Sequence, residues 1–286
     1  MELYLNYVDW ADADHELAAK AIARGLASHS ADHRGYWIHT SGTGILSYED
    51  QKLNVIGQPS AKIYCDDDSG IREVTSLPPE APHRNVDVIV LAASAENNGK
   101  VKTAIVCPPT IYGPGRGPGN QRSIQVYDLT SVTLQQGHGV MMGEGQNRWT
   151  NVHVHDLSNV YLELVEAAVA GGGKATLDDQ GYYFTENGEF IWGEVSRAIA
   201  AECKKQGFID TDEVVTLSIE QLDKVNPVLR AQWARNARGR AVRARKLFGW
   251  TPSGRGMYEE LGDIVKGEAK NLGLMPGHAK KAAGHA

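Results

Sequence analysis

Helix-like and strand-like segments alternate along the N-terminal third of the chain. Residues 14–27 have the apolar spacing of an amphipathic helix, and residues 84–96 form a second helix that ends at a turn at 97–99. Short apolar runs follow these helices at residues 36–41 and 102–107, and each run stops at glycine or proline. Strands of a parallel sheet are buried on both faces and are joined by crossover helices, which gives this pattern. The predicted fold class is therefore α/β, with a parallel sheet.

The same alternation continues in the second half of the chain. A helix follows Asp156, with apolar side chains at helical spacing, and it ends at the glycines 171–173. Residues 181–184 are predicted to form a strand, residues 191–204 an amphipathic helix, and residues 238–248 a short basic helix.

Two segments lack such a periodic pattern. Residues 47–80 are rich in Asp, Ser, Gly and Pro and are predicted to form a long surface loop. The last residues, 276–286, are small, basic and polar, which is typical of a frayed tail.

Composition restricts the kinds of partner. The 286 residues carry a net charge of −6, which gives no general attraction to nucleic acid or to anionic lipid. The three cysteines have no C-x-x-C spacing, and His153 and His155 are interpreted as packing and capping residues, so no metal site is predicted. Neither a secretory signal nor an apolar run of about 20 residues is recognisable. We therefore expect a cytoplasmic protein without a membrane or nucleic-acid partner.

The most informative motif is the loop Pro-Pro-Thr-Ile-Tyr-Gly-Pro-Gly at residues 108–115. It follows a predicted strand directly, and open α/β sheets bind ligands at that end of their strands. Three further motifs surround it in order: Ile-His-Thr-Ser-Gly-Thr-Gly at 38–44, Val-His-Val-His-Asp-Leu at 152–157, and Ala-Arg-Lys-Leu-Phe-Gly-Trp-Thr-Pro at 244–252. Over about residues 8–255 the chain resembles the extended short-chain dehydrogenase/reductase family, in its NAD-dependent epimerase/dehydratase group.

This resemblance implies a doubly wound sheet of Rossmann type that is incomplete at its N-terminal half. Residues 1–128 would form a partial NAD(P)-binding domain, residues 129–275 would complete the sheet and form a smaller substrate side, and residues 276–286 would be disordered. The implied activity is NAD(P)-dependent chemistry at a carbonyl or alcohol carbon of an aldehyde, ketone or sugar-nucleotide type substrate. The cofactor would be NAD or NADP, the partner a small-molecule substrate, and a homodimer is left open.

The glycine-rich start of the family has no counterpart in this sequence. Members begin with a strand, a G-x-x-G-x-x-G turn and a helix whose N-terminus binds the pyrophosphate. No such pattern occurs before residue 36, and the glycines at 113–119 alternate with proline and fit a loop. By the resemblance, residues 7–9 fall near the end of the fourth strand, so roughly 70 residues of the family fold would lie ahead of them. We expect either a late start or loss of the cofactor-binding half, with poor stability or dependence on a partner.

The catalytic pair of the family is also altered. Members carry Tyr-x-x-x-Lys at the start of the helix that corresponds to residues 84–96, where the tyrosine is the acid and base and the lysine lowers its pKa. Counting back from residues 91–93 places Pro79 at the tyrosine position and His83 at the lysine position, and the chain contains no Tyr-x-x-x-Lys. The usual serine at the preceding strand end falls on Gly42.

Three side chains are candidates for the altered chemistry. Ser41 and Thr43 stand at a strand's C-terminal end, where a hydroxyl faces the ligand crevice, although both residues also form turns. His83 is a candidate cation or proton relay because its ordinary pKa lies near neutrality. The alternative for His83 is a surface histidine at a helix start.

The resemblance also implies binding residues. Thr40, Pro108 and Thr110 fall where the nicotinamide end of the cofactor would lie, and Tyr112 belongs to the same loop. Tyr112 is also a candidate substitute acid, although in the family it is usually a packing residue. Arg238, in a cluster of arginines, is a candidate for binding a substrate phosphate, or else part of a solvated helix face.

Two other classes of protein fit the same sequence. NmrA-like regulators bind a dinucleotide without turning it over, and they keep the fold while lacking the tyrosine and lysine. A truncated product without stable function is the third reading. The choice between NAD and NADP is set after the second strand of this fold, and the resemblance places that segment before residue 1.

Overall fold

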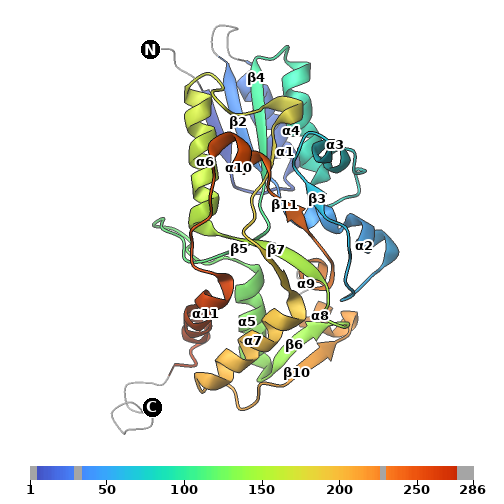
Figure 1. The fold of residues 1–286 in the computed structure, drawn as a ribbon, viewed down its shortest axis with the longest axis vertical. Helices are drawn as coiled ribbons and strands as arrows, with labels where there is room; N and C mark the ends of the chain where they lie inside the picture. Colours follow the sequence, from blue (N-terminus) through green and yellow to red (C-terminus); the bar gives the residue numbers. More distant parts are fainter. Residues whose placement is uncertain (1–4, 29–33, 226–229, 276–286) are drawn as a thin grey trace.

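A four-stranded parallel sheet organises the upper part of the molecule in Figure 1. The computed structural model describes residues 5–28, 34–225 and 230–275. The strand order is β1–β2–β4–β8, with β1 (Leu5–Asp9), β2 (Gly35–Thr40), β4 (Val101–Cys107) and β8 (Tyr182–Phe184). The α/β class, the parallel sheet and the Rossmann type predicted from the sequence are confirmed.

Helices lie against both faces of this sheet. α1 (Glu16–Ala27) and α4 (Arg84–Glu96) pack against each other behind the sheet in Figure 1, and α10 (Arg243–Phe248) lies in front of it beside α6 (Val154–Val169). The strands are consequently apolar along their length: in β4, all residues from Thr103 to Cys107 are buried. Continuous burial of this kind is expected only for strands covered on both sides.

The two helices behind the sheet form where the sequence predicts them. The bounds of α4 agree with the predicted range, and α1 begins two residues later than predicted. The N-cap of α1 is His15, whose ring nitrogen Nδ1 accepts from the backbone amide of Ala18 at 3.1 Å. Asp14, which precedes this cap, is therefore left to interact elsewhere.

The segment 47–80 is not the long surface loop that its composition predicts. It contains the end of η1 (Thr43–Ser47), then α2 (Tyr48–Leu53), β3 (Tyr64–Cys65) and α3 (Gly70–Thr75). β3 pairs in parallel with β11 (Gly239–Arg240), so the predicted basic helix 238–248 begins only at Arg243. The buried carboxylate of Asp66 accepts from the amides of Phe184 at 2.9 Å, Val242 at 2.6 Å and Arg243 at 3.1 Å. Partners more than a hundred residues away thus order a segment that looks irregular in isolation.

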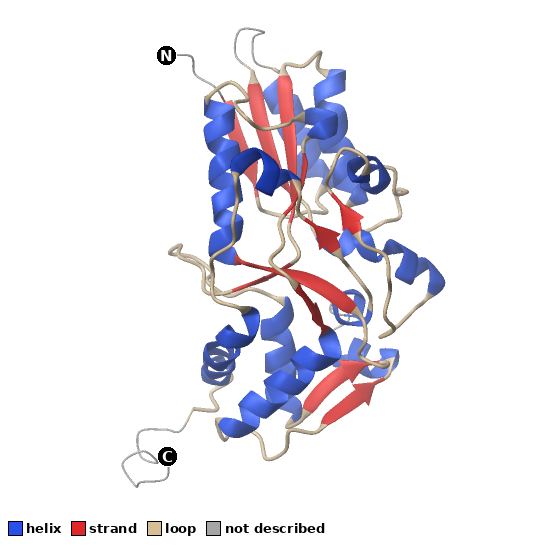
Figure 2. Cartoon of the chain, viewed as in Figure 1, coloured by secondary structure: helices blue, strands red, loops and turns tan. Residues whose placement is uncertain are grey.

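A second region lies below the sheet and carries the rest of the chain (Figure 2). Its strands are β5 (Thr110–Tyr112), β7 (Arg148–His153) and β9 (Glu189–Ile191), which form one sheet, and β6 (Gly139–Met142) and β10 (Val214–Leu217), which form another. Its helices are α5 (Gln125–Gln136), α7 (Trp192–Lys205), α8 (Ile219–Val225), α9 (Arg230–Ala234) and α11 (Met257–Asn271), and η2 (Asp178–Gln180) precedes β8. Within the described ranges, no helix combines the length and apolarity needed to cross a bilayer.

Candidate active site

A cavity of about 390 Å³ opens at the carboxyl ends of β2 and β4. This is the edge at which open α/β sheets bind ligands. The turn after β2 and the start of α4 form one side of the cavity, and the loop after β4 forms its base. The start of α5, together with residues from β7 and α9, forms the other side. The cavity thus lies between the parallel sheet and the second region.

Two backbone hydrogen bonds fix the turn after β2. The amide of Ser41 donates to the carbonyl of Val106 at 2.9 Å, and the amide of Thr43 donates to the carbonyl of Pro108 at 3.0 Å. Both side chains are buried at the cavity wall, and neither hydroxyl has a hydrogen-bond partner of normal geometry among the described residues. Buried hydroxyls are rarely left unpaired, so these two are available to a bound molecule.

His83 enters the cavity from the start of α4. It is the N-cap of that helix and has a left-handed backbone, with φ at 63°, which is uncommon for any residue other than glycine. Its Nδ1 lies 2.9 Å from Oδ1 of Asp14. Its Nε2 lies over the turn after β2, only 3.1 Å and 2.9 Å from where a Cβ would stand on Gly42 and Gly44. Glycine at those positions therefore makes room for the imidazole.

Asp14 and His83 perturb each other's pKa in opposite directions. Burial lowers the pKa of His83, but the hydrogen bond and charge of Asp14, with the charges of Asp87 and Asp12, outweigh it and leave the pKa raised. The hydrogen bond from His83 lowers the pKa of Asp14 against the effect of burial. The pair therefore favours an ionised carboxylate next to a histidine that titrates above its ordinary pKa of about 6.5.

Asp87 lies one turn after His83 on α4 and is fully buried. Its Oδ2 accepts from the hydroxyl of Tyr182 at 3.0 Å. Burial raises the pKa of Asp87, opposed by the charge of His39 and by the neighbouring hydroxyls of Ser41 and Tyr182. A buried carboxyl with a raised pKa, directly behind the cavity wall, is the kind of group that functional sites contain.

A second histidine and carboxylate pair lies behind the first. His39 on β2 is completely buried, and its Nδ1 lies 3.0 Å from Oδ2 of Asp9 at the end of β1. The hydrogen bond from His39 lowers the pKa of Asp9. Nε2 of His39 is buried and has no partner among the described residues. The carboxyl ends of β1 and β2 thus carry a polar cluster inside an otherwise apolar sheet.

The predicted catalytic residues lie together. Ser41, Thr43 and His83 all line the cavity, as does Pro108, which was predicted to bind the cofactor. Thr40 lies one residue before the cavity wall, and its hydroxyl is 2.5 Å from that of Tyr161 on α6. The carboxyl ends of the adjacent strands β2 and β4, together with the start of α4, bring these five residues to one edge.

The other three predicted binding residues lie outside the cavity walls. Thr110 is fully buried in β5, and its hydroxyl has no partner in the described part of the chain. Tyr112 packs its ring edge-to-face on His153 and donates its hydroxyl to the carbonyl of Arg255 at 2.8 Å. The guanidinium of Arg238 binds the carboxylate of Glu189 at 2.5 Å.

Several cavity residues were not predicted from the sequence. Asp14 stands at the start of the predicted helix 14–27, where it suits a helix cap, and its contact with His83 spans 69 positions along the chain. Trp149 of β7 and Gln232 of α9 were not recognised as site residues from the sequence. Asp87, which does not itself line the cavity, follows His83 by four positions on α4 and was likewise not singled out from the sequence.

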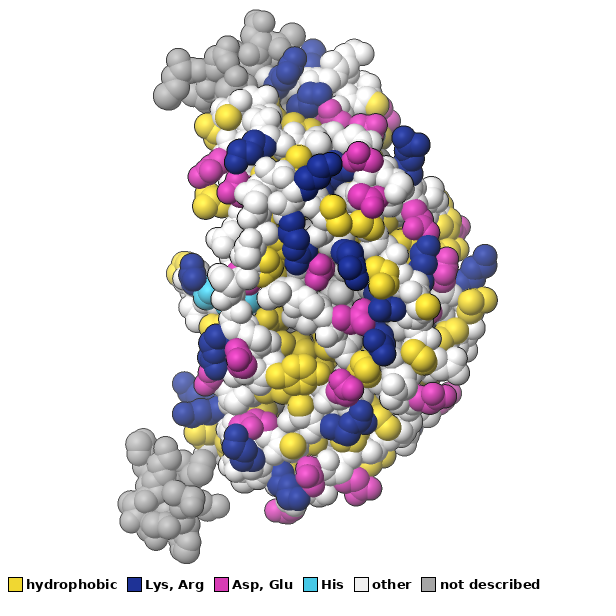
Figure 3. Space-filling model, in the orientation of Figure 1, with side chains coloured by type: hydrophobic (Ala, Val, Ile, Leu, Met, Phe, Trp, Pro, Cys, Tyr) yellow, Lys and Arg dark blue, Asp and Glu magenta, His cyan; other side chains and the backbone are white. Residues whose placement is uncertain are grey.

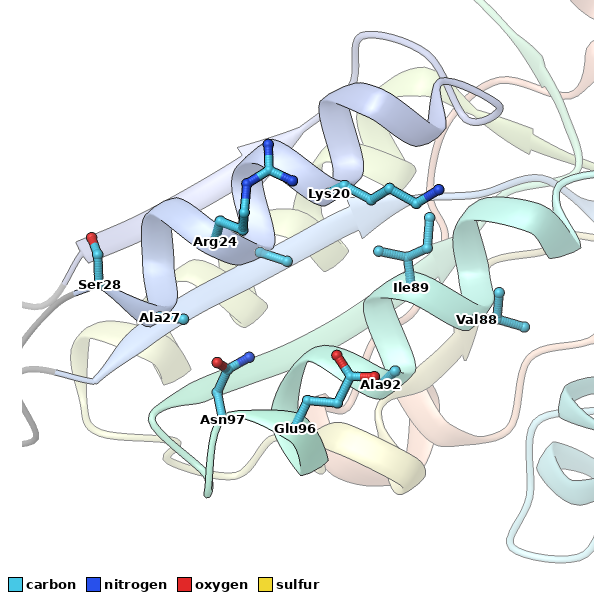
Figure 4. A pocket seen from close by; sticks show the side chains of 10 residues that line it. Lys20, Arg24, Ala27, Ser28, Val88, Ile89, Ala92, Glu96 and Asn97 are labelled. Atoms are coloured by element: carbon cyan, nitrogen blue, oxygen red, sulfur yellow. The ribbon is translucent and has the colours of Figure 1, made fainter.

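A larger groove, of about 730 Å³, lies between α1 and α4 (Figure 4). Lys20 and Arg24 of α1 and Glu96 of α4 line it, and it shares none of the cavity's residues. Basic and acidic side chains are intermixed over the face in Figure 3, without a continuous basic surface. No cluster of three metal-ligating side chains is found among the described residues.

Three comparisons relate the chain to known proteins. The model of a family described as the NAD dependent epimerase/dehydratase family matches residues 52–177. The chain is 35% identical over 273 residues to a protein named Oxidase ucsJ, from Acremonium sp, and the match covers 93% of this chain and 78% of that protein.

The fold is similar to that of solved sugar-nucleotide enzymes. A dTDP-glucose 4,6-dehydratase from Bacillus anthracis, in complex with NAD, matches 94% of this chain and 74% of its own, with a TM-score of 0.60 and 16% identity. A UDP-glucose 4-epimerase from Thermotoga maritima, with UDP-glucose, matches 91% and 71%, with a TM-score of 0.59 and 15% identity. At such identities the likeness is one of fold.

Proposed function

The chain belongs to the NAD-dependent epimerase/dehydratase family, and we propose that it is an NAD(P)-dependent oxidoreductase in which His83 exchanges a proton with the substrate oxygen. The substrate is a small molecule with an alcohol or carbonyl carbon. The observation that carries the proposal is the Asp14–His83 pair, whose free imidazole nitrogen Nε2 stands at the cavity wall beside Ser41 and Thr43. A 35% identical relative whose name is that of an oxidase supports the redox class.

The residues at the cavity fit the reactive end of a nicotinamide cofactor. The hydroxyls of Ser41 and Thr43 are buried and unpaired in the described part of the chain, and they stand at the strand ends where this fold binds ligands. They would hydrogen-bond polar groups of the cofactor or of the substrate. A bound nicotinamide supplies the hydride acceptor for alcohol oxidation, or the donor for the reverse reaction.

In the oxidation direction, neutral His83 accepts the hydroxyl proton at Nε2 as the alcohol carbon loses its hydride. The negative charge of Asp14, hydrogen-bonded at Nδ1, stabilises the imidazolium that forms and holds the ring in one orientation. In the reduction direction, the same nitrogen returns the proton to the carbonyl oxygen. Ser41 and Thr43 orient the oxygen that gains or loses the proton.

The experiment is to measure NADH and NADPH binding by fluorescence and then turnover on a panel of alcohols, ketones and aldehydes. We expect His83→Asn to lower kcat/KM by about 100-fold or more while cofactor binding is retained. His138→Asn is the matched control, because His138 lies outside the cavity and its Nδ1 hydrogen-bonds the carbonyl of the neighbouring Gly139. Activity of His83→Asn equal to that of the parent would overturn the role of His83.

A non-catalytic dinucleotide sensor is the second candidate, because the family's tyrosine and lysine are both replaced. Its signature is tight binding of one cofactor without turnover of any compound in the panel. In that case His83→Asn would change binding or nothing, and the oxidoreductase proposal would be wrong.

A further inference from the structure

The described walls of the cavity consist mainly of apolar and neutral polar side chains, whereas a negatively charged substrate needs cationic side chains. We infer that the cavity selects an uncharged alcohol or ketone with a largely apolar skeleton and a second hydrogen-bond donor, and does not accept a nucleoside-diphosphate sugar. This inference rests on the proposed function, since it names the substrate class of the same site.

Apolar side chains form much of the surface that a substrate would touch. Trp149, Ile111 and Ile124 line the cavity, as do the prolines at 82, 108 and 109. Trp149 is held rigidly, because its indole nitrogen donates to the carbonyl of Arg235 at 2.7 Å and its ring packs edge-to-face on Trp192. A flat, immobile apolar wall gives affinity to an apolar skeleton at little conformational cost.

The polar atoms on the same walls are neutral. Besides the hydroxyls of Ser41 and Thr43, the side-chain oxygens of Gln125 and Gln232 are buried and have no partner among the described residues. Amide oxygens accept hydrogen bonds, so they fit a substrate hydroxyl or N–H. A diphosphate offers only acceptors, so it would leave both amide oxygens without a donor.

The charge balance of the described lining points the same way. Asp14 and His83 are its only ionisable side chains, and neither lysine nor arginine is among them. Two arginines are sequence neighbours of lining residues, but both form ion pairs with other side chains. Arg122 binds Glu268 at 2.8 Å and Asp128 at 2.5 Å, and Arg148 binds Glu189 at 3.1 Å. A diphosphate brought into this cavity would lose its hydration without gaining a cation from those walls, which is strongly unfavourable.

The start of α5 supplies one further binding feature. Its N-cap, Ile124, makes no side-chain hydrogen bond to the first turn, and Gln125 and Ile124 both line the cavity. Unpaired amides at a helix start bind an acceptor oxygen.

The test compares two probes on the whole chain in the presence of NADH or NADPH. The neutral probe is 6-hydroxy-1-tetralone, a bicyclic ketone that carries one hydroxyl as its hydrogen-bond donor, and the charged probe is UDP-glucose. Binding is measured by calorimetry, and turnover is measured separately from the nicotinamide absorbance. We expect the tetralone to bind at least about ten-fold more tightly than UDP-glucose. UDP-glucose binding as tightly as the tetralone, or neither probe binding, overturns the inference.

A substitution at an exposed lining residue changes the charge of the cavity without affecting folding. Ile124 is 57% exposed, so Ile124→Lys adds a cation without disturbing the core. We expect it to weaken tetralone binding by about ten-fold and to strengthen UDP-glucose binding. Leu162→Lys is the matched control, because Leu162 on α6 is 56% exposed and does not line the cavity. Equal effects of the two variants on both probes would also overturn the inference.

Binding and turnover separate this inference from the proposed function. Selective tetralone binding without turnover leaves the substrate class standing and contradicts the oxidoreductase role. Turnover of UDP-glucose supports the oxidoreductase role and contradicts the substrate class.

Discussion

Replacement of Asp14 by asparagine removes the charge that holds His83 while keeping a side chain of the same shape. In the parent, the Asp14 side chain is 56% exposed and that of His83 is 23% exposed, at a distance of 2.9 Å. Water screens a pair of this exposure, so its contribution to folding is on the order of 0.5 kcal/mol. Its contribution to catalysis is larger, because the imidazolium forms only as the proton is transferred. We expect kcat/KM at the pH optimum to fall by about ten-fold or more.

The contribution of the Asp14–His83 pair to the stability of the fold depends on pH. The pKa of His83 is raised from 6.5 in the fold, so its stabilising effect is complete below that value and is lost as the pH rises through the raised pKa. The pKa of Asp14 is lowered from 3.8, so its stabilising effect is present above that value and is lost as the pH falls through the lowered pKa. The pair therefore stabilises the fold most between about pH 4 and 6.5. Asp14→Asn should be destabilised in urea at pH 5.5 and nearly unchanged at pH 8.5.

The same change moves the activity profile. Oxidation needs neutral His83, so the acidic limb of kcat/KM follows the pKa of His83. Loss of the Asp14 charge lowers that pKa, and the acidic limb should move to lower pH while the plateau falls. NMR titration of the imidazole, assigned with His83→Asn, reports the pKa without relying on activity.

Asp12→Asn is the matched control for this experiment. Asp12 also raises the pKa of His83 by its charge, but it accepts from the amide of Asp14 and makes no hydrogen bond to the imidazole. Its effect on the His83 pKa and on kcat/KM should be clearly smaller. If Asp12→Asn and Asp14→Asn behave alike, or if neither moves the pKa, the assignment of a specific Asp14–His83 pair is refuted.

Two further substitutions test the surroundings of the pair. Gly44→Ala places a Cβ only 2.9 Å from Nε2 of His83, so it should displace the imidazole ring. We expect kcat/KM to fall by about ten-fold with little change in Tm. An unchanged kcat/KM would show that the position of the ring is not critical. Asp66→Ala removes the carboxylate that accepts from three backbone amides, and it should lower the free energy of unfolding in urea by about 3 kcal/mol. Asp68→Ala is the control, because the Asp68 side chain is 84% exposed, and it should lower this free energy by less than about 1 kcal/mol.

Local patterns in the sequence predicted the strands β2, β4 and β8 of the parallel sheet, whereas β1 was expected only from the family resemblance. The range predicted for α4 matches the structure because apolar periodicity and a turn signal at 97–99 both act within a few residues. The segment 47–80 was mispredicted because its order depends on Asp66, whose amide partners lie 118 to 177 positions away. Periodicity carries no information about such contacts.

The site was only partly predictable for the same reason. Ser41, Thr43 and His83 follow from strand ends and from the family motif, and all three line one cavity. The hydrogen-bond partner of His83 could not be recognised, because Asp14 also suits a helix cap and only the tertiary fold turns it toward the imidazole. Arg238 looked like a phosphate ligand because its ion pair with Glu189 is invisible in the sequence.

The replacement of both members of the family's catalytic pair is chemically coherent. A tyrosine has an ordinary pKa of about 10 and needs a nearby cation to act near neutral pH, which is the role of the lysine four residues later. A histidine already titrates near neutrality, and a cation beside it would lower its pKa and weaken it as a base. His83, which the resemblance places at the lysine position, instead has Asp14 at one nitrogen, and the carboxyl of Asp87 follows four residues later on α4. In the proposed mechanism the imidazole at this position exchanges the proton itself, so neither the phenol nor a second cation is needed. The absence of Tyr-x-x-x-Lys therefore does not by itself argue against catalysis.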